Sequence, residues 1–180
     1  MEFIETGAAG GDGSLSFMLL NKLGYSVTAV TGRMELEGYL KDLGAINIMS
    51  RDDLLAMSRP LNSGKWAGGI DTVGSTLLAN VLSAINYGGS VACCGNASGN
   101  DLPTTVLPFI LRKIQLIGID SVYCPTNMRN DAWKRLGDLI TSEEFENITN
   151  EVSLSEIEKP AKLILEGKIQ GRTVINIKDC

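Results

Sequence analysis

The sequence predicts an α/β protein built on a doubly wound, parallel, six-stranded sheet. Six short apolar runs of strand length alternate with segments of helical periodicity. Glycines follow several of these segments, and 180 residues with 44% hydrophobic side chains suffice for one substantial core. Parallel strands need crossover connections, and right-handed crossovers place helices on both faces of a sheet, so the alternation favours this architecture.

The chain opens with a strand, a glycine turn and a helix. Apolar residues 3–4 run into the string TGAAGGDG at residues 6–13. The apolar residues that follow have the spacing of a largely buried helix, which Gly24 ends. Residues 25–30 (YSVTAV) form the β-branched run of a second strand, and residues 34–43 form an amphipathic helix.

The same alternation continues to residue 119, with a turn expected at the glycine pair of residues 88–89. The remaining strands of the sheet are predicted at residues 46–49, 66–73, 90–94 and 114–119. The helices between them are predicted at residues 52–57, 76–85 and 105–111.

Beyond residue 122 the pattern changes. Helices are predicted at residues 127–140 and 155–166, a short strand at 151–153, and a terminal strand at 173–177. We therefore divide the chain into a first domain of residues 1–121 and a separate unit of residues 122–180.

Composition excludes several classes of function. The net charge of −5 leaves no basic footprint for a nucleic acid, and the absence of histidine removes Ser-His-Asp catalysis and imidazole metal ligands. No apolar run reaches the length of a membrane span, so we expect no membrane partner and a cytoplasmic location. The cysteines form no C-x-x-C or Cys/His cluster, so we expect incidental thiols and no metal site; they are Cys93, Cys94, Cys124 and Cys180.

The glycine turn predicts a site for a diphosphate. A strand that enters a helix through closely spaced glycines gathers backbone N–H groups and the positive end of the helix dipole at one point. Gly7, Gly10, Gly11 and Gly13 form the floor of that site. A tight turn without a ligand is the alternative. Asp12 lowers the affinity for a diphosphate unless it points into solvent or caps the helix.

The end of the second strand favours NADPH over NADH. An NAD site expects an acidic side chain about 20 residues past the glycines, whereas this strand ends in VTGR at residues 30–33. Thr31 can donate a hydroxyl hydrogen bond, and Arg33 can bind a 2′-phosphate with its guanidinium. Arg51 follows the neighbouring third strand and supplies a second cation.

The glycine string also matches the cofactor turn of short-chain dehydrogenases, but a second test fails. Those enzymes need a Tyr-x-x-x-Lys pair, in which the lysine lowers the tyrosine pKa for proton transfer. None of the four tyrosines is followed by a lysine at that distance.

Longer strings along the whole chain carry a more specific resemblance. They include TGAxGGxGS at 6–14, WAGGIDTVG at 66–74, LPTTVLPFILR at 102–112 and IQGRT at 169–173. The chain resembles the C-terminal half of zinc-independent medium-chain dehydrogenase/reductases, specifically the acrylyl-CoA reductase (NADPH) subgroup of the quinone oxidoreductase family. Members of that family usually carry an apolar residue where Asp12 stands.

The resemblance implies a Rossmann-type dinucleotide-binding domain at residues 1–121. Residues 122–180 resemble the segment that completes a GroES-like catalytic domain, whose amino-terminal part is missing here, so the strand at 174–177 is expected to expose apolar surface. Either the chain is a fragment, or a partner chain supplies the rest. Edge pairing through the sixth strand implies a homodimer.

The resemblance also assigns cofactor contacts, although no catalytic residue. The residues assigned to the diphosphate are Gly10, Gly11, Gly13 and Ser14, and those assigned to the 2′-phosphate are Thr31, Arg33 and Arg51. The residues assigned to the ribose and nicotinamide are Thr72, Val73, Gly95 and Asn96. Arg172 is assigned a further contact with the cofactor. The implied reaction is the NADPH-dependent reduction of the activated C=C bond of acryloyl-CoA, or of a similar α,β-unsaturated carbonyl or quinone. The alternatives are an NADPH-binding module without catalysis and a truncated, inactive fragment.

Overall fold

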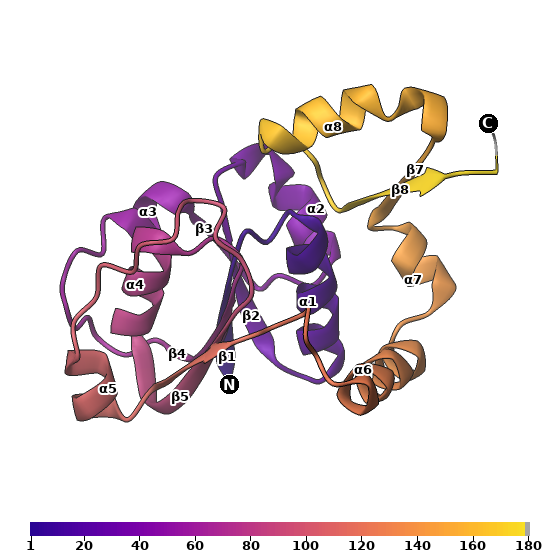
Figure 1. Cartoon of the computed structure of the whole chain (residues 1–180). Helices are drawn as coiled ribbons and strands as arrows, with labels where there is room; N and C mark the ends of the chain where they lie inside the picture. The colour runs from indigo at the N-terminus through magenta and orange to yellow at the C-terminus, as the bar shows by residue number, and fades with distance from the viewer. Residues whose placement is uncertain (179–180) are drawn as a thin grey trace.

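The computed structural model describes residues 1–178 and contains the six-stranded parallel sheet that the sequence predicts (Figure 1). The strand order is β3-β2-β1-β4-β5-β6, and every neighbouring pair is parallel. The strands are β1 (Glu2–Thr6), β2 (Ser26–Thr31), β3 (Asn47–Ser50), β4 (Trp66–Asp71), β5 (Ile85–Cys93) and β6 (Gln115–Gly118). The helices between them are α1 (Gly11–Lys22), α2 (Glu37–Asp42), α3 (Arg51–Leu55), α4 (Ser75–Ser83) and α5 (Leu107–Arg112), with a 3₁₀ turn at Met34–Leu36.

The strand order reverses between β1 and β4. From β1 the chain moves outward to β2 and β3, then returns across the sheet to β4 and moves outward on the other side. The connections that leave β1 and β4 therefore diverge and leave a crevice at the carboxyl ends of these strands, which is where open α/β sheets bind ligands.

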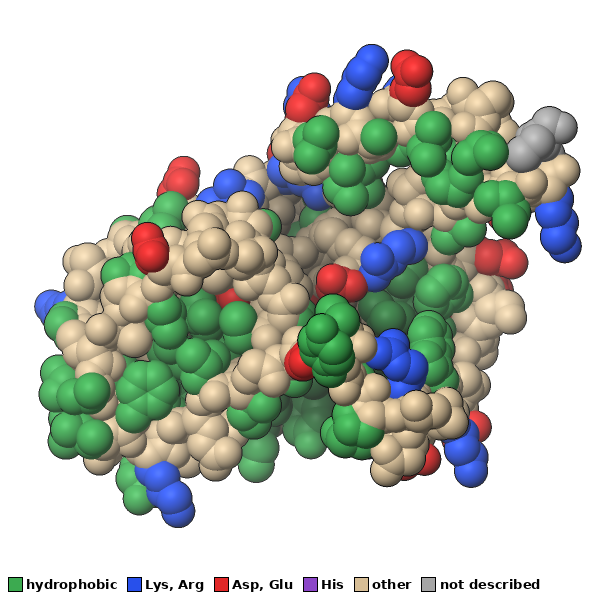
Figure 2. Space-filling model, viewed as in Figure 1, with side chains coloured by type: hydrophobic (Ala, Val, Ile, Leu, Met, Phe, Trp, Pro, Cys, Tyr) green, Lys and Arg blue, Asp and Glu red, His purple; other side chains and the backbone are tan. Residues whose placement is uncertain are grey.

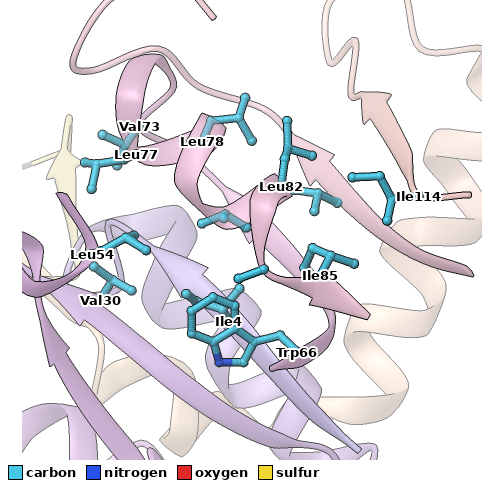
Figure 3. Packing of buried hydrophobic residues seen from close by; sticks show 13 residues of the cluster. Ile4, Val30, Leu54, Trp66, Val73, Leu77, Leu78, Leu82, Ile85 and Ile114 are labelled. Carbon is cyan, nitrogen blue, oxygen red and sulfur yellow. The ribbon is translucent and has the colours of Figure 1, made fainter. Parts of the chain in front are cut away.

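Two apolar clusters cover the two faces of the sheet. The first cluster packs α3 and α4 onto β1, β4 and β5, with Trp66, Leu82 and Ile85 fully buried or nearly so. Figure 3 shows its side chains gathered between α4 and the strands. The second cluster packs α1 and α2 onto β1 and β2 through Phe17 and Leu40. Burial on both faces explains why the strands read as continuous apolar runs.

The turn predicted at residues 88–89 is wrong, because both glycines lie inside β5. The pairing of β4 with β5 shifts register there, so that Trp66 pairs with Ile85 but Gly68 pairs with Ser90. Gly88 adopts a positive φ of 76°, and a Cβ on Gly89 would lie 2.4 Å from the carbonyl oxygen of Ala67. The glycine pair therefore permits a bulge within a strand, rather than ending a helix and starting a new strand.

The C-terminal segment follows the side of the sheet that carries α1 and α2 (Figure 1). It consists of α6 (Thr126–Leu139), α7 (Ser142–Glu146), β7 (Thr149–Ser153), a 3₁₀ turn (Leu154–Glu156), α8 (Glu158–Leu165) and β8 (Arg172–Asn176). Strands β7 and β8 form a separate parallel pair. Lys22 of α1 bonds to Glu144 of α7 at 2.6 Å.

Helix α7 is absent from the sequence prediction, although its start carries a recognisable signal. Thr141 and Glu144 form a capping box, in which each side chain accepts a hydrogen bond from the backbone N–H of the other residue.

The expected apolar exposure of the terminal strand is present, with Val174 39% and Ile177 72% exposed. Among residues 1–178, no helix is both long and apolar enough to cross a bilayer.

Candidate functional site

A cavity of about 690 Å³ opens where β1, β2 and β4 end. The glycine turn and the strand ends form one wall, and α8 with the segment leading into β8 forms the other. Figure 2 shows the molecule hollowed beneath this overhanging segment. The predicted cofactor contacts that line the cavity are Gly10, Gly11, Thr31, Arg33, Arg51, Thr72, Val73 and Arg172. The predicted contacts outside its lining are Gly13, Ser14, Gly95 and Asn96.

The glycine turn brings the start of α1 against the end of β1. Gly7 has a φ of +70°, and a Cβ there would lie 2.2 Å from Oγ1 of Thr72. A Cβ on Gly13 would lie 2.5 Å from the carbonyl oxygen of Gly7. Gly10 caps α1 without a side-chain acceptor, and its own N–H donates to the carbonyl oxygen of Gly7 at 2.9 Å. The N–H groups of the first turn, from Gly11 onward, therefore have no capping side chain, and Gly11 lies at the cavity wall. This geometry suits an anion.

Ser14 lies on the inner side of α1. Its side chain is fully buried; Oγ donates a 3.4 Å hydrogen bond to the carbonyl oxygen of Ala8 and accepts a 2.7 Å bond from the Tyr39 hydroxyl. Burial raises the pKa of Tyr39 despite that bond to Ser14. The hydroxyl of Ser14 thus joins α1 to α2, behind the cavity wall.

Replacing Ser14 with alanine is expected to lower stability and leave NADPH affinity unchanged. The variant loses the acceptor of the Tyr39 hydroxyl, and the net contribution of one such hydrogen bond is about 1 kcal/mol. Urea unfolding and a fluorescence titration with NADPH measure the two effects separately. A large loss of affinity at unchanged stability would instead make Ser14 a direct ligand contact.

Arg33, which follows β2, and Arg51, which follows β3, both line the cavity, as the sequence predicts. The Arg33 N–H donates to Oγ1 of Thr31 at 3.0 Å, and its Nη2 donates to the carbonyl oxygen of Ile169 at 2.8 Å. Arg51 reaches over the neighbouring backbone, since a Cβ on Gly32 would lie 2.5 Å from its guanidinium. Both arginines line the same cavity, because β3, which precedes Arg51, pairs with β2.

A buried polar network joins the ends of β1 and β4. Thr6 donates to Oδ1 of Asp71 at 2.6 Å, and the Gly74 N–H donates to Oδ2 of the same carboxylate at 2.8 Å. Thr72 donates its hydroxyl to the carbonyl oxygen of Thr6 at 2.9 Å. Burial raises the pKa of Asp71, and these hydrogen bonds oppose the rise. The network holds the crevice walls in place.

Gly95 and Asn96 lie just beyond the cavity. A Cβ on Gly95 would lie 2.2 Å from the carbonyl oxygen of Thr72, so Gly95 packs behind that residue. Asn96 donates its amide to Asn100 within the same loop. The loop reaches the cavity instead through Ala97 and Ser98, which sequence reasoning missed because the loop conformation has no local sequence signature.

Arg172, which lines the cavity, forms an ion pair with Asp12 in the first turn of α1. The distance from Nη2 of Arg172 to Oδ1 of Asp12 is 2.7 Å. Asp12 therefore neither caps α1 nor extends into solvent alone. Sequence reasoning left the role of Asp12 open, since its partner lies 160 residues away in the chain.

The sequence does not predict two further features, one beneath the cavity wall in β1 and one in the wall itself. Glu5 of β1 is fully buried, and neither of its carboxyl oxygens has a hydrogen-bond partner. Burial, reinforced by Asp12, raises the pKa of Glu5 well above its ordinary value. The second feature is the apolar wall that α8 and the turn before it provide, formed by Ile157, Pro160, Ala161, Ile164 and Leu165. The amphipathic period of α8 was visible in the sequence, but the surface that its apolar face covers was not.

Neither metal ligands nor an activated thiol stand out at the cavity. Within residues 1–178, no three His, Cys, Asp or Glu side chains cluster closely enough to hold a metal ion. Burial and neighbouring acidic groups raise the pKa of Cys94 to about 11, which disfavours its thiolate. Cys93, Cys94 and Cys124 are free thiols, and Cys180 lies outside the described residues.

Comparison with known proteins gives one family match and several close relatives. The model of the zinc-binding dehydrogenase family matches residues 11–142. The chain is 49% identical over 176 residues to "Probable acrylyl-CoA reductase AcuI" of Escherichia coli, covering 98% of this chain and 54% of that protein. The chain thus spans about half the length of the curated relatives it matches.

Solved structures share the fold closely. The yhdH oxidoreductase from Salmonella enterica, in complex with NADP, superposes with a TM-score of 0.95 at 50% identity, over 98% of this chain and 54% of that one. The yhfP protein of Bacillus subtilis, with NAD bound, gives a TM-score of 0.91 at 44% identity, over 98% of this chain and 54% of that one.

Proposed function

This chain belongs to the zinc-binding dehydrogenase family, and we propose that it is the cofactor-binding half of an NADPH-dependent oxidoreductase. The observation that carries the proposal is the pair of guanidinium groups, Arg33 and Arg51, on one rim of the cavity that the glycine turn also lines. An acidic residue at the end of β2 would mark an NAD site, and this chain has none there.

The residues present fit the dinucleotide. The bare backbone of Gly10 and Gly11 allows a diphosphate to approach the N-terminal end of α1, where the helix dipole attracts anions. Arg33 and Arg51 bind the 2′-phosphate through charge-assisted hydrogen bonds. Thr72 and Val73, held by the network of Asp71, contact the ribose and nicotinamide side. When bound, NADPH supplies a hydride.

We place the reaction as the reduction of an activated C=C bond. Acryloyl-CoA, or a similar α,β-unsaturated carbonyl, would accept the hydride at its β-carbon and a proton from solvent at its α-carbon, in keeping with the name of the Escherichia coli relative. A quinone would take up the same hydride and a proton to become a hydroquinone. The apolar side chains of α8 line the cavity wall and exclude water from that step. A second candidate is NADPH binding without turnover, which the cavity lining favours because its charged residues, among those that the structure describes, are three arginines and Glu166.

A fluorescence titration tests the proposed function directly. Saturable NADPH binding is expected, with NADH at least about tenfold weaker because it lacks the group that the arginines bind. NADPH oxidation on addition of acryloyl-CoA would support the reductase, and tight binding without oxidation would support the binding module. Failure of NADPH to bind at any concentration would contradict both.

We also propose a homodimer that pairs the free edges of two β6 strands. Strand β6 is the last in the sheet, and its surroundings expose apolar side chains, with Ile117 44% and Ile119 50% exposed. An apolar strand edge is a template for pairing with another chain. Light scattering is expected to give twice the chain mass of 19.3 kDa. A monomer at high protein concentration would contradict this assembly.

The same proposal includes the division of the chain into two units and the cellular compartment in which the enzyme works. Residues 1–121 form the dinucleotide-binding domain, and residues 122–180 form the unit that completes a catalytic domain. We further propose that the enzyme works without zinc in the cytoplasm, where its free thiols stay reduced. Stoichiometric zinc in the purified protein would contradict zinc independence.

A further inference from the structure

The ion pair between Asp12 and Arg172 places a guanidinium directly over the glycine turn. Asp12 lies in the first turn of α1, and Arg172 is the first residue of β8. A Cβ added to Gly11 would lie 2.8 Å from both Cζ and Nε of Arg172. The cationic group therefore covers the same backbone that the diphosphate is expected to contact.

The main chain around Arg172 is anchored without the ion pair. The Gly171 N–H donates to the carbonyl oxygen of Ala9 at 2.9 Å, and the Arg172 N–H donates to that of Ile148 at 2.7 Å. Gly171 and Gly10 also form an isolated β-bridge. These backbone bonds fix where the arginine side chain starts, so Asp12 determines only the direction in which it extends.

The exposure of the pair argues against a role in stability. The side chains of Arg172 and Asp12 are 46% and 65% exposed, and exposed ion pairs add little to the free energy of folding. A carboxylate in the first turn of α1 would by itself repel a diphosphate. Paired with Arg172, its charge is neutralised, and a guanidinium has five N–H donors, of which the carboxylate occupies one here.

We propose that Asp12 is a positioning residue, which holds the Arg172 guanidinium over the glycine turn so that Arg172 binds the diphosphate of the dinucleotide. This inference rests on the proposed function, NADPH binding. Arg33, which follows β2, and Arg51, which follows β3, are the residues proposed above to bind the 2′-phosphate of the same molecule. The pair thus makes the C-terminal segment part of the cofactor site.

A double-mutant cycle tests whether Asp12 affects NADPH binding through Arg172. NADPH is titrated into the full chain, Asp12→Asn, Arg172→Gln and the double variant, and adenosine 2′-monophosphate, which lacks a diphosphate, is titrated in parallel. Arg172→Gln is expected to weaken NADPH binding about tenfold and to leave the monophosphate within about twofold. Asp12→Asn is expected to weaken NADPH binding about threefold in the full chain, but to strengthen it in the Arg172→Gln background, where it removes an unpaired carboxylate.

Two controls separate positioning from structure. Asp12→Glu retains the charge and is expected to keep NADPH affinity within about twofold, while thermal midpoints of all variants stay within about 2 °C. The inference is overturned if Asp12→Asn strengthens NADPH binding equally in both backgrounds, or if Arg172→Gln weakens both ligands equally. If the full chain binds the monophosphate and NADPH, but the effects of the Asp12 and Arg172 substitutions on NADPH affinity are additive, this inference alone is overturned. If the full chain binds neither ligand, the proposed function is overturned.

Discussion

Replacing Glu5 with valine is expected to raise the free energy of unfolding at pH 7 by at least about 2 kcal/mol, within the range for burying a polar group without a hydrogen bond. Both carboxyl oxygens of Glu5 are buried without a partner, and the residue stands between Ala29 of β2 and Ile70 of β4. Valine suits a central strand and removes both unpaired oxygens.

The increase in the free energy of unfolding caused by Glu5→Val is expected to depend on pH. The pKa of Glu5 in the folded chain is raised well above its ordinary value of 4.5, mainly by burial. Below that ordinary value the carboxyl is protonated in both the folded and the unfolded chain, so the difference between wild type and variant is smallest there. As pH rises, the unfolded chain releases the proton and the folded chain retains it, so the wild type loses up to about 1.4 kcal/mol per pH unit.

Urea unfolding from pH 4 to pH 8 measures this dependence. Glu35→Gln, which changes an exposed glutamate, serves as the matched control and should shift stability by less than about 0.5 kcal/mol at every pH. A Glu5→Val variant that is less stable than the wild type at pH 7, or whose gain is constant with pH, would show that the carboxyl finds a compensating partner in solution.

Replacing Arg33 with glutamine is expected to weaken NADPH binding by about 10- to 100-fold and to leave NADH binding unchanged. Hydrogen bonds to charged groups contribute about 1.5 to 3 kcal/mol each, and the 2′-phosphate is absent from NADH. The variant should therefore lose its preference between the two cofactors. Arg51→Gln is expected to act in the same direction with a smaller effect, since Arg51 reaches the same phosphate from β3 across Gly32.

Parallel titrations of NADPH and NADH measure the change in preference. Arg59→Gln is the matched control, because Arg59 is exposed and lies outside the cavity lining. Arg33 also donates to the carbonyl oxygen of Ile169, so the variant could weaken the contact between β2 and the C-terminal segment. Equal loss of affinity for both cofactors would show that Arg33 acts through that contact rather than on the 2′-phosphate.

Patterns within a few residues of one another predicted most of the sheet. The apolar strand runs and the glycine string at residues 6–13 depend on local periodicity and backbone freedom, and the structure places them in the expected order. The glycine pair at residues 88–89 does not by itself indicate which structure forms, because a bulge and a chain-reversing turn use the same residue type. Only the register against β4 distinguishes the two.

In the candidate site, too, some features are evident from the sequence and others depend on tertiary structure. That cations rather than a carboxylate stand at the end of β2 is evident from the sequence, because each strand carries its own terminal residues into the crevice. The direction of the Ser14 hydroxyl, the lack of a partner for Glu5 and the pairing of Asp12 with Arg172 were decided by tertiary structure alone. These three depend on atoms contributed by segments distant in the chain, and no local pattern encodes which of those segments will meet.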